Sequence, residues 1–405
     1  MNLDLPLDDL QPRYDAIVVG GGIQGAGCAQ ALAAAGFATL LVEQNTIASA
    51  TSSRSSKLIH GGLRYIESAQ FSLVRKSLQE RSVLQALAPS LIRPRPFFIP
   101  VYRGQRLKAW QLHIALTCYW ALGGFGTQAR YRSLPREQWS RLPGLKQDEL
   151  VAVFEYSDCQ TDDVELTKAV IRSAQSLGCD CVEHTRLVNG TLHATTQAEL
   201  LLEQAGIQRT VSCELVVNAA GPWASGVQQS LEQAPPAPAV DLVKGSHIEF
   251  DLPVCDSILY VEAPSDRRAV FIIPWKGGTM VGTTEQPHTG DPARCDASIE
   301  EIEYLEATLR HYFPDYQGQR TADWAGLRVL PSAAAPAGPA SLRPFSARAR
   351  DTLVIADNPS APRLVSLFGG KLTAYRATAA KVAKMAQLTL GEPKRQLDTA
   401  DCPLS

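Results

Sequence analysis

The stretch ATSSRSSKLIHGGLRYIE, residues 50–67, holds three basic residues and one histidine among serines and glycines, with few residues that would build a core. The basic residues are Arg54, Lys57 and Arg64, and the histidine is His60. The whole chain has a formal net charge of -2, so it exerts no general attraction on nucleic acid or anionic lipid. Anion binding must therefore come from a local cluster, and we expect no nucleic-acid partner.

A glycine-rich motif near the start of the chain is a second group of residues that could bind an anionic ligand. Residues 14–19 are an apolar, β-branched run with the length of a buried strand, and GGGIQGAG follows at Gly20. Alanine-rich residues 23–35 favour a helix that ends at Gly36, and ATLLVE predicts a second strand ending at Glu43. These segments predict a βαβ unit.

This unit has the properties of a dinucleotide site. Glycines without a Cβ let the backbone approach a pyrophosphate, which meets the N-terminus of the helix. Glu43 could accept hydrogen bonds from a ribose diol, whereas it would repel a 2′-phosphate. We therefore predict a bound dinucleotide other than NADP.

Two later segments repeat the pattern of a strand followed by glycine. CELVVNAAGPWA predicts a strand from about Leu215, and PRLVSLFGGKLTAYR predicts a strand, a glycine turn and a long helix that starts near Lys371. We expect both strands to join one doubly wound sheet. The helix start at Gly369 and Gly370 would direct free N–H groups at a ligand above the sheet, and a reduced flavin, anionic at its pyrimidine end, would be stabilised there.

The region between these strands has a different pattern. GSHIEF, RAVFIIPW and GTMVGTTE are short β-rich runs, which favour an antiparallel sheet that covers a ligand. Residues 298–313 predict a helix that begins with a capping box, and residues 331–340 predict a surface loop. The predicted fold class is α/β: a Rossmann-like FAD-binding domain (14–90, 151–235 and 345–395) with an interleaved antiparallel-sheet cap domain (91–150 and 236–344).

The cysteines and the longest apolar run indicate where in the cell the protein is found. Nine irregularly spaced cysteines, and no basic leader before an apolar run, indicate a reduced, cytoplasmic chain. Cys179 and Cys181 lack a second close pair, so we predict inert, buried thiols and no metal. Residues 113–126 are shorter than the about 20 residues that cross a bilayer. With basic residues before them and interfacial aromatics within, they predict either a buried helix, which we favour, or a helix docked on the inner face of the membrane.

Seven segments in order resemble the FAD-dependent glycerol-3-phosphate dehydrogenases of the D-amino-acid-oxidase-like group: TSSRSSKLIHGGLRYIE, FEYSDCQTDD, VVNAAGPW, KGSHI, FIIPW, VGTTE and SLFGGKLTAYR. The resemblance covers residues 14–385. It implies FAD and the oxidation of sn-glycerol 3-phosphate to dihydroxyacetone phosphate, with electrons passed to quinone or another acceptor. The family's usual members continue with a helical C-terminal domain, so we expect a short form.

The motifs and the resemblance together assign residues. The expected FAD-binding residues are Gly20, Gly22, Ile23, Gly25, Glu43, Ser52, Ser53, Lys57, Leu58, Gly61, Gly62, Ala220, Gly221, Gly369, Gly370, Lys371, Leu372 and Thr373. The expected substrate-binding residues are Arg64, Tyr65, Thr283, Thr284, Arg328, Arg350 and Lys371. The expected catalytic residues are His60, Arg64, His247, Arg328 and Lys371.

The chemistry of the substrate supports these assignments. A phosphomonoester carries close to two negative charges and needs more than one cation when it leaves water, and arginine can bind its oxygens bidentately. Histidine suits the removal of a hydroxyl proton near neutral pH, and the sequence leaves His60 and His247 open as the base. Three alternatives also stay open: oxidation of another 2-hydroxy acid or an amine, an oxidase that uses oxygen, and a non-catalytic FAD-binding protein.

Overall fold

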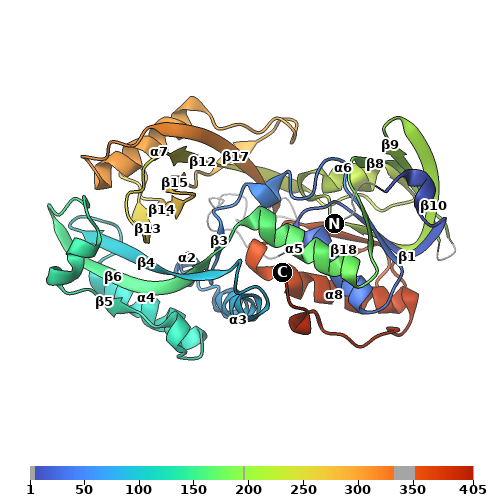
Figure 1. Cartoon of the computed structure of the whole chain (residues 1–405), viewed down its shortest axis with the longest axis horizontal. Coiled ribbons are helices and arrows are strands. Elements are labelled where there is room, and N and C mark those ends of the chain that lie inside the picture. The colour runs from blue at the N-terminus through green and yellow to red at the C-terminus, as the bar shows by residue number, and fades with distance from the viewer. Residues whose placement is uncertain (1–4, 195–196, 333–351, 405) are drawn as a thin grey trace.

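Two β-sheets lie side by side along the long axis of the molecule, each with helices packed against it (Figure 1). The computed structural model describes residues 5–194, 197–332 and 352–404. The first sheet has the order β11-β8-β9-β10-β1-β2-β7, and β19 pairs with β10 and β18. Its strands are β1 (Arg13–Val19), β2 (Thr39–Val42), β7 (Asp180–Val182), β8 (Thr185–Leu192), β9 (Ala198–Gln204), β10 (Ile207–Asn218), β11 (Leu231–Glu232), β18 (Leu353–Ala356) and β19 (Leu364–Phe368).

The predicted βαβ unit forms the centre of this sheet. Strand β1 is parallel to β2, β10 is parallel to β1 and β19, and α1 (Ile23–Ala34) connects β1 to β2. Ala16 and Val18 pack against α1, α5 (Asp163–Ser176) and α8 (Tyr375–Leu390), while Ile17 and Val19 face the hairpin of β8 and β9. Both faces are covered, which explains the continuous apolar run in β1. The prediction that the two later strands join the sheet of the βαβ unit is confirmed, but the β8–β9 hairpin covers the face opposite α1, where a doubly wound sheet would have helices.

The second sheet is mostly antiparallel, as expected. Its order is β16-β12-β15-β14-β13-β4-β6-β3, with β17 paired to β12 and β5 to β6. The strands are β3 (Leu58–Ile59), β4 (Arg93–Tyr102), β5 (Arg132–Ser133), β6 (Leu150–Gln160), β12 (Val240–Phe250), β13 (Ile258–Glu262), β14 (Ala269–Trp275), β15 (Gly278–Gly282), β16 (Gln286–His288) and β17 (Arg320–Pro331). The remaining helices are α2 (Arg64–Glu67), α3 (Phe71–Leu87), α4 (Ala109–Leu122), α6 (Ala224–Gln229) and α7 (Ile299–Tyr312).

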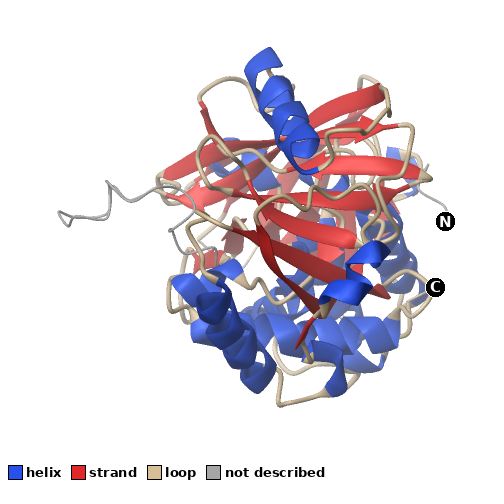
Figure 2. Ribbon diagram, turned by 90° about the vertical axis from the view of Figure 1, so that its left-hand side faces the viewer, coloured by secondary structure: helices blue, strands red, loops and turns tan. Residues whose placement is uncertain are grey.

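Helices cover both faces of this second sheet (Figure 2). Helix α7 packs Leu305 and Leu309 on one face, and α4 packs Leu112 and Leu116 near the other. The predicted start of α7 is confirmed, because Ser298 accepts the N–H of Glu301 and forms the capping box. Both faces of the second sheet are therefore packed against helices.

Some details differ from the sequence analysis. Strands β3 and β6 belong to the second sheet, although residues 58–59 and 151–160 were assigned to the FAD-binding domain, because β6 pairs with β4 along its length. Helix α8 begins at Tyr375 rather than near Lys371, after a 3₁₀ turn at Leu372–Ala374. Apart from the first two residues, the predicted loop 331–340 lies outside the described residues.

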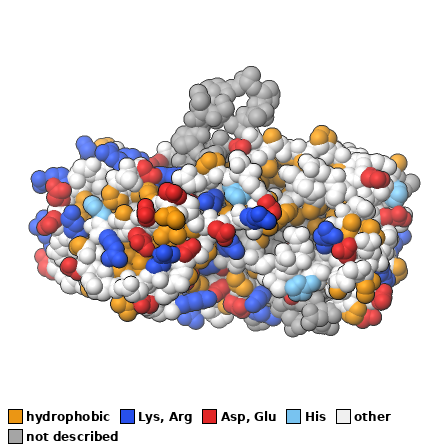
Figure 3. All heavy atoms as spheres, turned by 90° about the horizontal axis from the view of Figure 1, so that it is seen from above, with side chains coloured by type: hydrophobic (Ala, Val, Ile, Leu, Met, Phe, Trp, Pro, Cys, Tyr) orange, Lys and Arg blue, Asp and Glu red, His pale blue; other side chains and the backbone are white. Residues whose placement is uncertain are grey.

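Helix α4 accounts for the longest apolar run. It buries Leu112, Leu116 and Tyr119 and exposes Trp110 and Ile114. Among the helices that the structure describes, none has both the length and the apolarity needed to cross a bilayer. Acidic and basic side chains are interspersed over the face seen in Figure 3.

All nine cysteines are free thiols, and eight are buried while Cys118 is half-buried. The sulfur atoms of Cys179 and Cys181 lie 3.7 Å apart. Within the described ranges, no group of three His, Cys, Asp or Glu side chains could hold a metal ion.

Candidate active site

A cavity of about 350 Å³ lies between the two sheets. The first sheet contributes residues that follow the carboxyl ends of β1, β2, β10 and β19, where doubly wound sheets bind their ligands. The second sheet contributes residues of β12, β13, β14 and β17. The predicted residues on its wall are Gly20, Gly22, Ile23, Glu43, Ser52, Leu58, His60, Gly62, Arg64, Tyr65, Ala220, Gly221, His247, Thr283, Arg328, Gly369, Gly370, Lys371, Leu372 and Thr373.

The glycine motif is shaped for a closely approaching ligand. Gly20 has a φ of +112°, and a Cβ there would lie 2.7 Å from the carbonyl oxygen of Ala219. A Cβ on Gly25 would lie 1.8 Å from the carbonyl oxygen of Gly20, so only glycine lets α1 start this close to β1. Gly22 is the N-cap of α1 and has no side chain to cap it. This turn therefore presents backbone and a positive helix end to the cavity, as a pyrophosphate requires.

Glu43 lies at the end of β2, on the cavity wall. Its carboxylate accepts hydrogen bonds from the N–H groups of Gly21 at 2.6 Å and Asn45 at 2.8 Å. Burial raises the pKa of this carboxyl, although the two N–H groups oppose the shift. A fixed acceptor at this strand end matches a ribose diol, so the glycine turn and Glu43 together fit FAD.

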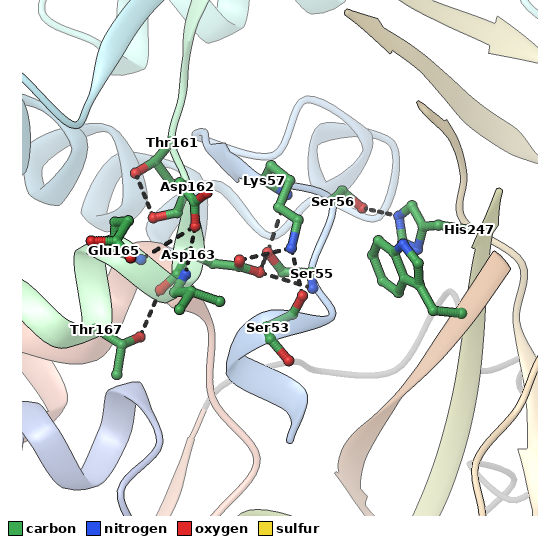
Figure 4. A network of polar contacts seen from close by, with 12 residues as sticks. Ser53, Ser55, Ser56, Lys57, Thr161, Asp162, Asp163, Glu165, Thr167 and His247 are labelled. Carbon is green, nitrogen blue, oxygen red and sulfur yellow. Dashed lines mark hydrogen bonds and ion pairs between the residues drawn. The ribbon is translucent and has the colours of Figure 1, made fainter. Parts of the chain in front are cut away.

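The segment from Ser53 to Lys57 is tied down behind the cavity (Figure 4). Asp163, the first residue of α5, accepts the Ser55 hydroxyl at 2.6 Å and the Lys57 ammonium at 2.7 Å. Both members of the Lys57–Asp163 ion pair are buried. This pair and the serine bond fix the backbone that carries Ser56 and Leu58 to the cavity wall.

Cations from three distant segments meet on this wall. The ammonium nitrogen of Lys371 lies 3.9 Å from the ring centroid of Tyr65, and the guanidinium carbon of Arg64 lies 5.3 Å from the same centroid. Arg328 donates to the hydroxyl of Thr283 at 2.8 Å. The three cations all line the same cavity, and binding of a doubly charged anion needs more than one cation.

Glu285 is a carboxylate within this cluster. It lies 3.5 Å from the Arg328 guanidinium and 2.9 Å from the Arg268 guanidinium. Its charge also acts on Arg64. It was not predicted from the sequence, although it directly follows the assigned threonines in VGTTE. Glu285 is therefore an ion-pair partner of both Arg268 and Arg328.

The two candidate bases have different surroundings. His60 is half-buried, lines the cavity and packs edge-on against Phe271, with ring centroids 6.3 Å apart. His247 is 2% exposed, and its Nε2 lies 3.0 Å from the hydroxyl oxygen of Ser56. Burial, with the charges of Arg328 and Lys57, holds the pKa of His247 well below its ordinary value. This environment favours the neutral form of the His247 imidazole.

Five predicted residues are not on the cavity wall: Gly25, Ser53, Lys57, Gly61 and Thr284. The Lys57 side chain turns away to Asp163, and Thr284 donates to Glu301 at 2.5 Å in the second sheet. The glycines act through close packing: a Cβ on Gly61 would lie 2.5 Å from the Tyr119 hydroxyl. Arg350 lies outside the described residues.

Several wall residues escaped the sequence analysis. Tyr260 and Phe271 reach the cavity from β13 and β14, and Ser56 reaches it from within the opening polar stretch. For Ser56 the sequence offers only its position in TSSRSSKLIH, because nothing in the sequence distinguishes its hydroxyl from those of the neighbouring serines. The strand aromatics carried no signal that separates a cavity wall from a core.

Residues 15–376 match the family model described as FAD dependent oxidoreductase. Glycerol-3-phosphate dehydrogenase of Pseudomonas aeruginosa is 37% identical over 382 residues, which cover 92% of this chain and 72% of that protein. Aerobic glycerol-3-phosphate dehydrogenase of Escherichia coli is 34% identical over 375 residues, 90% of this chain and 72% of that protein. Alpha-glycerophosphate oxidase of Streptococcus pyogenes is 33% identical over 343 residues, 80% of this chain and 56% of that protein.

Solved structures show the same fold. Glycerol-3-phosphate dehydrogenase from Bacillus halodurans, complexed with FAD, has a TM-score of 0.75 at 25% identity, over 98% of this chain and 68% of that chain. Glycine oxidase from Geobacillus kaustophilus has a TM-score of 0.72 at 21% identity, over 98% of this chain and 99% of that chain. The second likeness concerns the fold alone.

Proposed function

The chain belongs to the family of FAD-dependent oxidoreductases, and from this premise we propose that it oxidises sn-glycerol 3-phosphate to dihydroxyacetone phosphate. The main observation in favour of this substrate is that Arg64, Arg328 and Lys371 all lie on the wall of one cavity. A phosphomonoester loses strong hydration when it enters such a site, and several cations are needed to replace it. The relatives named for glycerol 3-phosphate or glycerophosphate support the same choice.

FAD is the cofactor, and when bound it would supply the hydride acceptor for the oxidation at C2 of the substrate. The glycine turn from Gly20 to Gly25 would hold its pyrophosphate, and Glu43 its ribose. The residues after β19, Gly369 to Thr373, would line the flavin end of the site. Their 3₁₀ turn comes before α8, so backbone N–H groups of the turn, rather than of α8 itself, would face the ring.

His60 is the base in this proposal. It takes the proton of the C2 hydroxyl, while the C2–H bond breaks and its electron pair leaves as hydride. His60 lies on the cavity wall and is half-buried. His247 is less suited, because Ser56 occupies its Nε2 and its Nδ1 is enclosed by protein.

A related reaction on an amine or another 2-hydroxy acid is the second candidate. A carboxylate substrate carries one charge and needs one arginine, as a rule bidentate. The cluster of Arg64, Arg328 and Lys371 exceeds that need, so the phosphate ester is favoured. A binding protein without catalysis would have no use for a histidine placed beside the same cluster.

Quinone is the proposed electron acceptor, reached by docking on the inner face of the cytoplasmic membrane. Trp110, Ile114 and Phe125 on and after α4 are 61%, 54% and 62% exposed. Arg103 and Lys108 lie exposed before the helix and suit anionic lipid headgroups. Sedimentation with anionic vesicles should capture the protein, and Trp110→Ser with Ile114→Ser should release it. Hydrogen peroxide formed in air at the turnover rate would instead identify an oxidase.

The test of the proposed function is an anaerobic titration. Purified protein with bound FAD is mixed with sn-glycerol 3-phosphate, and the flavin absorbance near 450 nm is expected to bleach. Glycine, alanine and 2-hydroxyglutarate serve as matched controls and should leave the spectrum unchanged. If one of these controls bleached the flavin and glycerol 3-phosphate did not, the control compound would be the substrate and the proposed function would be wrong.

A further inference from the structure

Ser56 and His247 are joined across the two halves of the site. Ser56 lies between η2 (Thr51–Ser53) and β3, and His247 lies on β12 of the second sheet. Their side chains meet at 3.0 Å, between the serine oxygen and Nε2 of the histidine (Figure 4). Both residues line the cavity, so this bond forms part of its wall.

The histidine ring is fixed in place. It stacks on Trp324 with a centroid distance of 4.3 Å and an interplanar angle of 16°. On β15, a Cβ on Gly282 would lie 2.2 Å from its Cδ2 atom, so glycine is needed there for the ring to fit. The ring is therefore held in one plane, and the hydrogen bond to Ser56 sets Nε2 toward the serine.

The serine is fixed equally well. Its neighbours Ser55 and Lys57 are both bound by the buried carboxylate of Asp163. A backbone held on both sides keeps the Ser56 oxygen at one place on the cavity wall. The contact is therefore built into the fold.

The surroundings of the ring select its tautomer. A neutral imidazole has one donor and one acceptor nitrogen. Nδ1 is buried and has no hydrogen-bond partner among the described residues. A buried N–H without an acceptor is rarer than a buried acceptor without a donor, so the proton belongs on Nε2. The positive charges of Arg328 and Lys57 oppose a second proton on the ring.

We propose that His247 donates its Nε2 proton to Ser56, and that Ser56 thereby presents its own hydroxyl proton to the oxygen of the substrate that reacts in the cavity. A serine hydroxyl has one proton and can accept a hydrogen bond while it donates that proton. In this arrangement His247 is a positioning residue, and Ser56 is the group that touches substrate. The inference rests on the proposed function.

The role of the donor follows from the reaction. As His60 removes the hydroxyl proton while the C2–H bond breaks, partial negative charge develops on the C2 oxygen in the transition state. A fixed donor stabilises that charge without having to reorganise. Loss of such a donor from an enclosed site lowers the rate by about 10²-fold or more.

The experiment combines kinetics with a readout that needs no substrate. Anaerobic stopped flow of the FAD-loaded Ser56→Ala variant should show flavin reduction about 10²-fold slower than wild type, with KM little changed. Ser56→Thr keeps a hydroxyl and should recover part of the rate. His247→Gln, whose amide can still donate to Ser56, should stay faster than His247→Ala. Reduction of Ser56→Ala at the wild-type rate would overturn the proposal.

The second measurement is ¹⁵N NMR of histidine-labelled, FAD-loaded protein without substrate, with the His247 signal assigned by its loss in His247→Gln. The expected pattern is a neutral ring protonated at Nε2, unchanged between about pH 6 and 8. A ring protonated at Nδ1, or at both nitrogens, would contradict the proposal that neutral His247 donates its Nε2 proton to Ser56. If wild-type flavin is not reduced by glycerol 3-phosphate, the proposed function fails, and the NMR pattern still decides the tautomer independently.

Discussion

The ammonium group of Lys371 lies 3.9 Å from the ring centroid of Tyr65, although one residue follows β19 and the other belongs to α2. This contact places a cation from the end of the first sheet next to Arg64, whose guanidinium lies near the same ring. Tyr65 is buried, so its ring is a firm support for both cations. The site thus gathers positive charge by packing it around an aromatic ring.

Replacing Tyr65 by Leu should weaken substrate binding. A cation–π contact contributes about 0.5–2 kcal/mol, so KM for glycerol 3-phosphate should rise about 2- to 30-fold. Tyr65→Phe keeps the ring but loses the hydroxyl that is hydrogen-bonded to Arg64, so its KM should rise less than that of Tyr65→Leu. An equal rise in both variants would show that the hydroxyl matters rather than the ring.

The Lys57–Asp163 pair should contribute strongly to stability. Asp163→Asn leaves the buried ammonium of Lys57 without its carboxylate, which should lower the free energy of unfolding by about 3–5 kcal/mol. Glu165→Gln breaks the exposed pair with Lys168 on the same helix and should cost below about 0.5 kcal/mol. Urea denaturation of the three proteins measures the difference. Similar losses in both variants would contradict the role assigned to Asp163.

Gly25→Ala should abolish FAD binding. The added Cβ would lie 1.8 Å from the carbonyl oxygen of Gly20, so the start of α1 must move away from β1. Gly226→Ala in α6 meets nothing within 4 Å and is the control. The ratio of flavin to protein after purification measures the effect. Full occupancy in Gly25→Ala would show that the turn tolerates a side chain.

His247 should make the protein less stable in acid. Its pKa in the folded state lies well below 6.5, so below pH 6.5 the unfolded chain binds a proton that the folded protein does not. The free energy of unfolding should fall as pH drops, by up to about 1.4 kcal/mol per pH unit from this residue. His247→Gln should remove that part of the slope. Equal slopes in wild type and His247→Gln would contradict the assignment.

The parts of this protein that sequence could predict are those governed by local constraints. The glycine turn, the capping box at Ser298 and the βαβ unit each follow from sterics or hydrogen bonding within a few residues. The convergence of Arg64, Arg328 and Lys371 came from a family resemblance, since no spacing reveals it.

Other features depend on tertiary packing. Lys57 has a φ of 58°, which turns its side chain toward Asp163 and away from the expected cofactor. The late start of α8 follows positive φ values at Gly369 and Gly370 and an extended Lys371. The roles of Ser56 and Glu285 arise from contacts between segments far apart in the sequence, with His247 on β12 and Arg328 on β17. Sequence patterns within one element carry no information on such contacts.

The central claim is that the cations on the cavity wall recognise a phosphate ester above the flavin. Anaerobic stopped flow should compare glycerol 3-phosphate with glycerol at equal concentrations, in wild type and in Arg328→Met. Hydrogen bonds to charged groups contribute about 1.5–3 kcal/mol each, so glycerol should reduce the flavin at least about 100-fold more slowly in wild type. The preference should shrink about 10- to 100-fold in the variant. Equal reduction by glycerol and glycerol 3-phosphate in wild type would contradict the account.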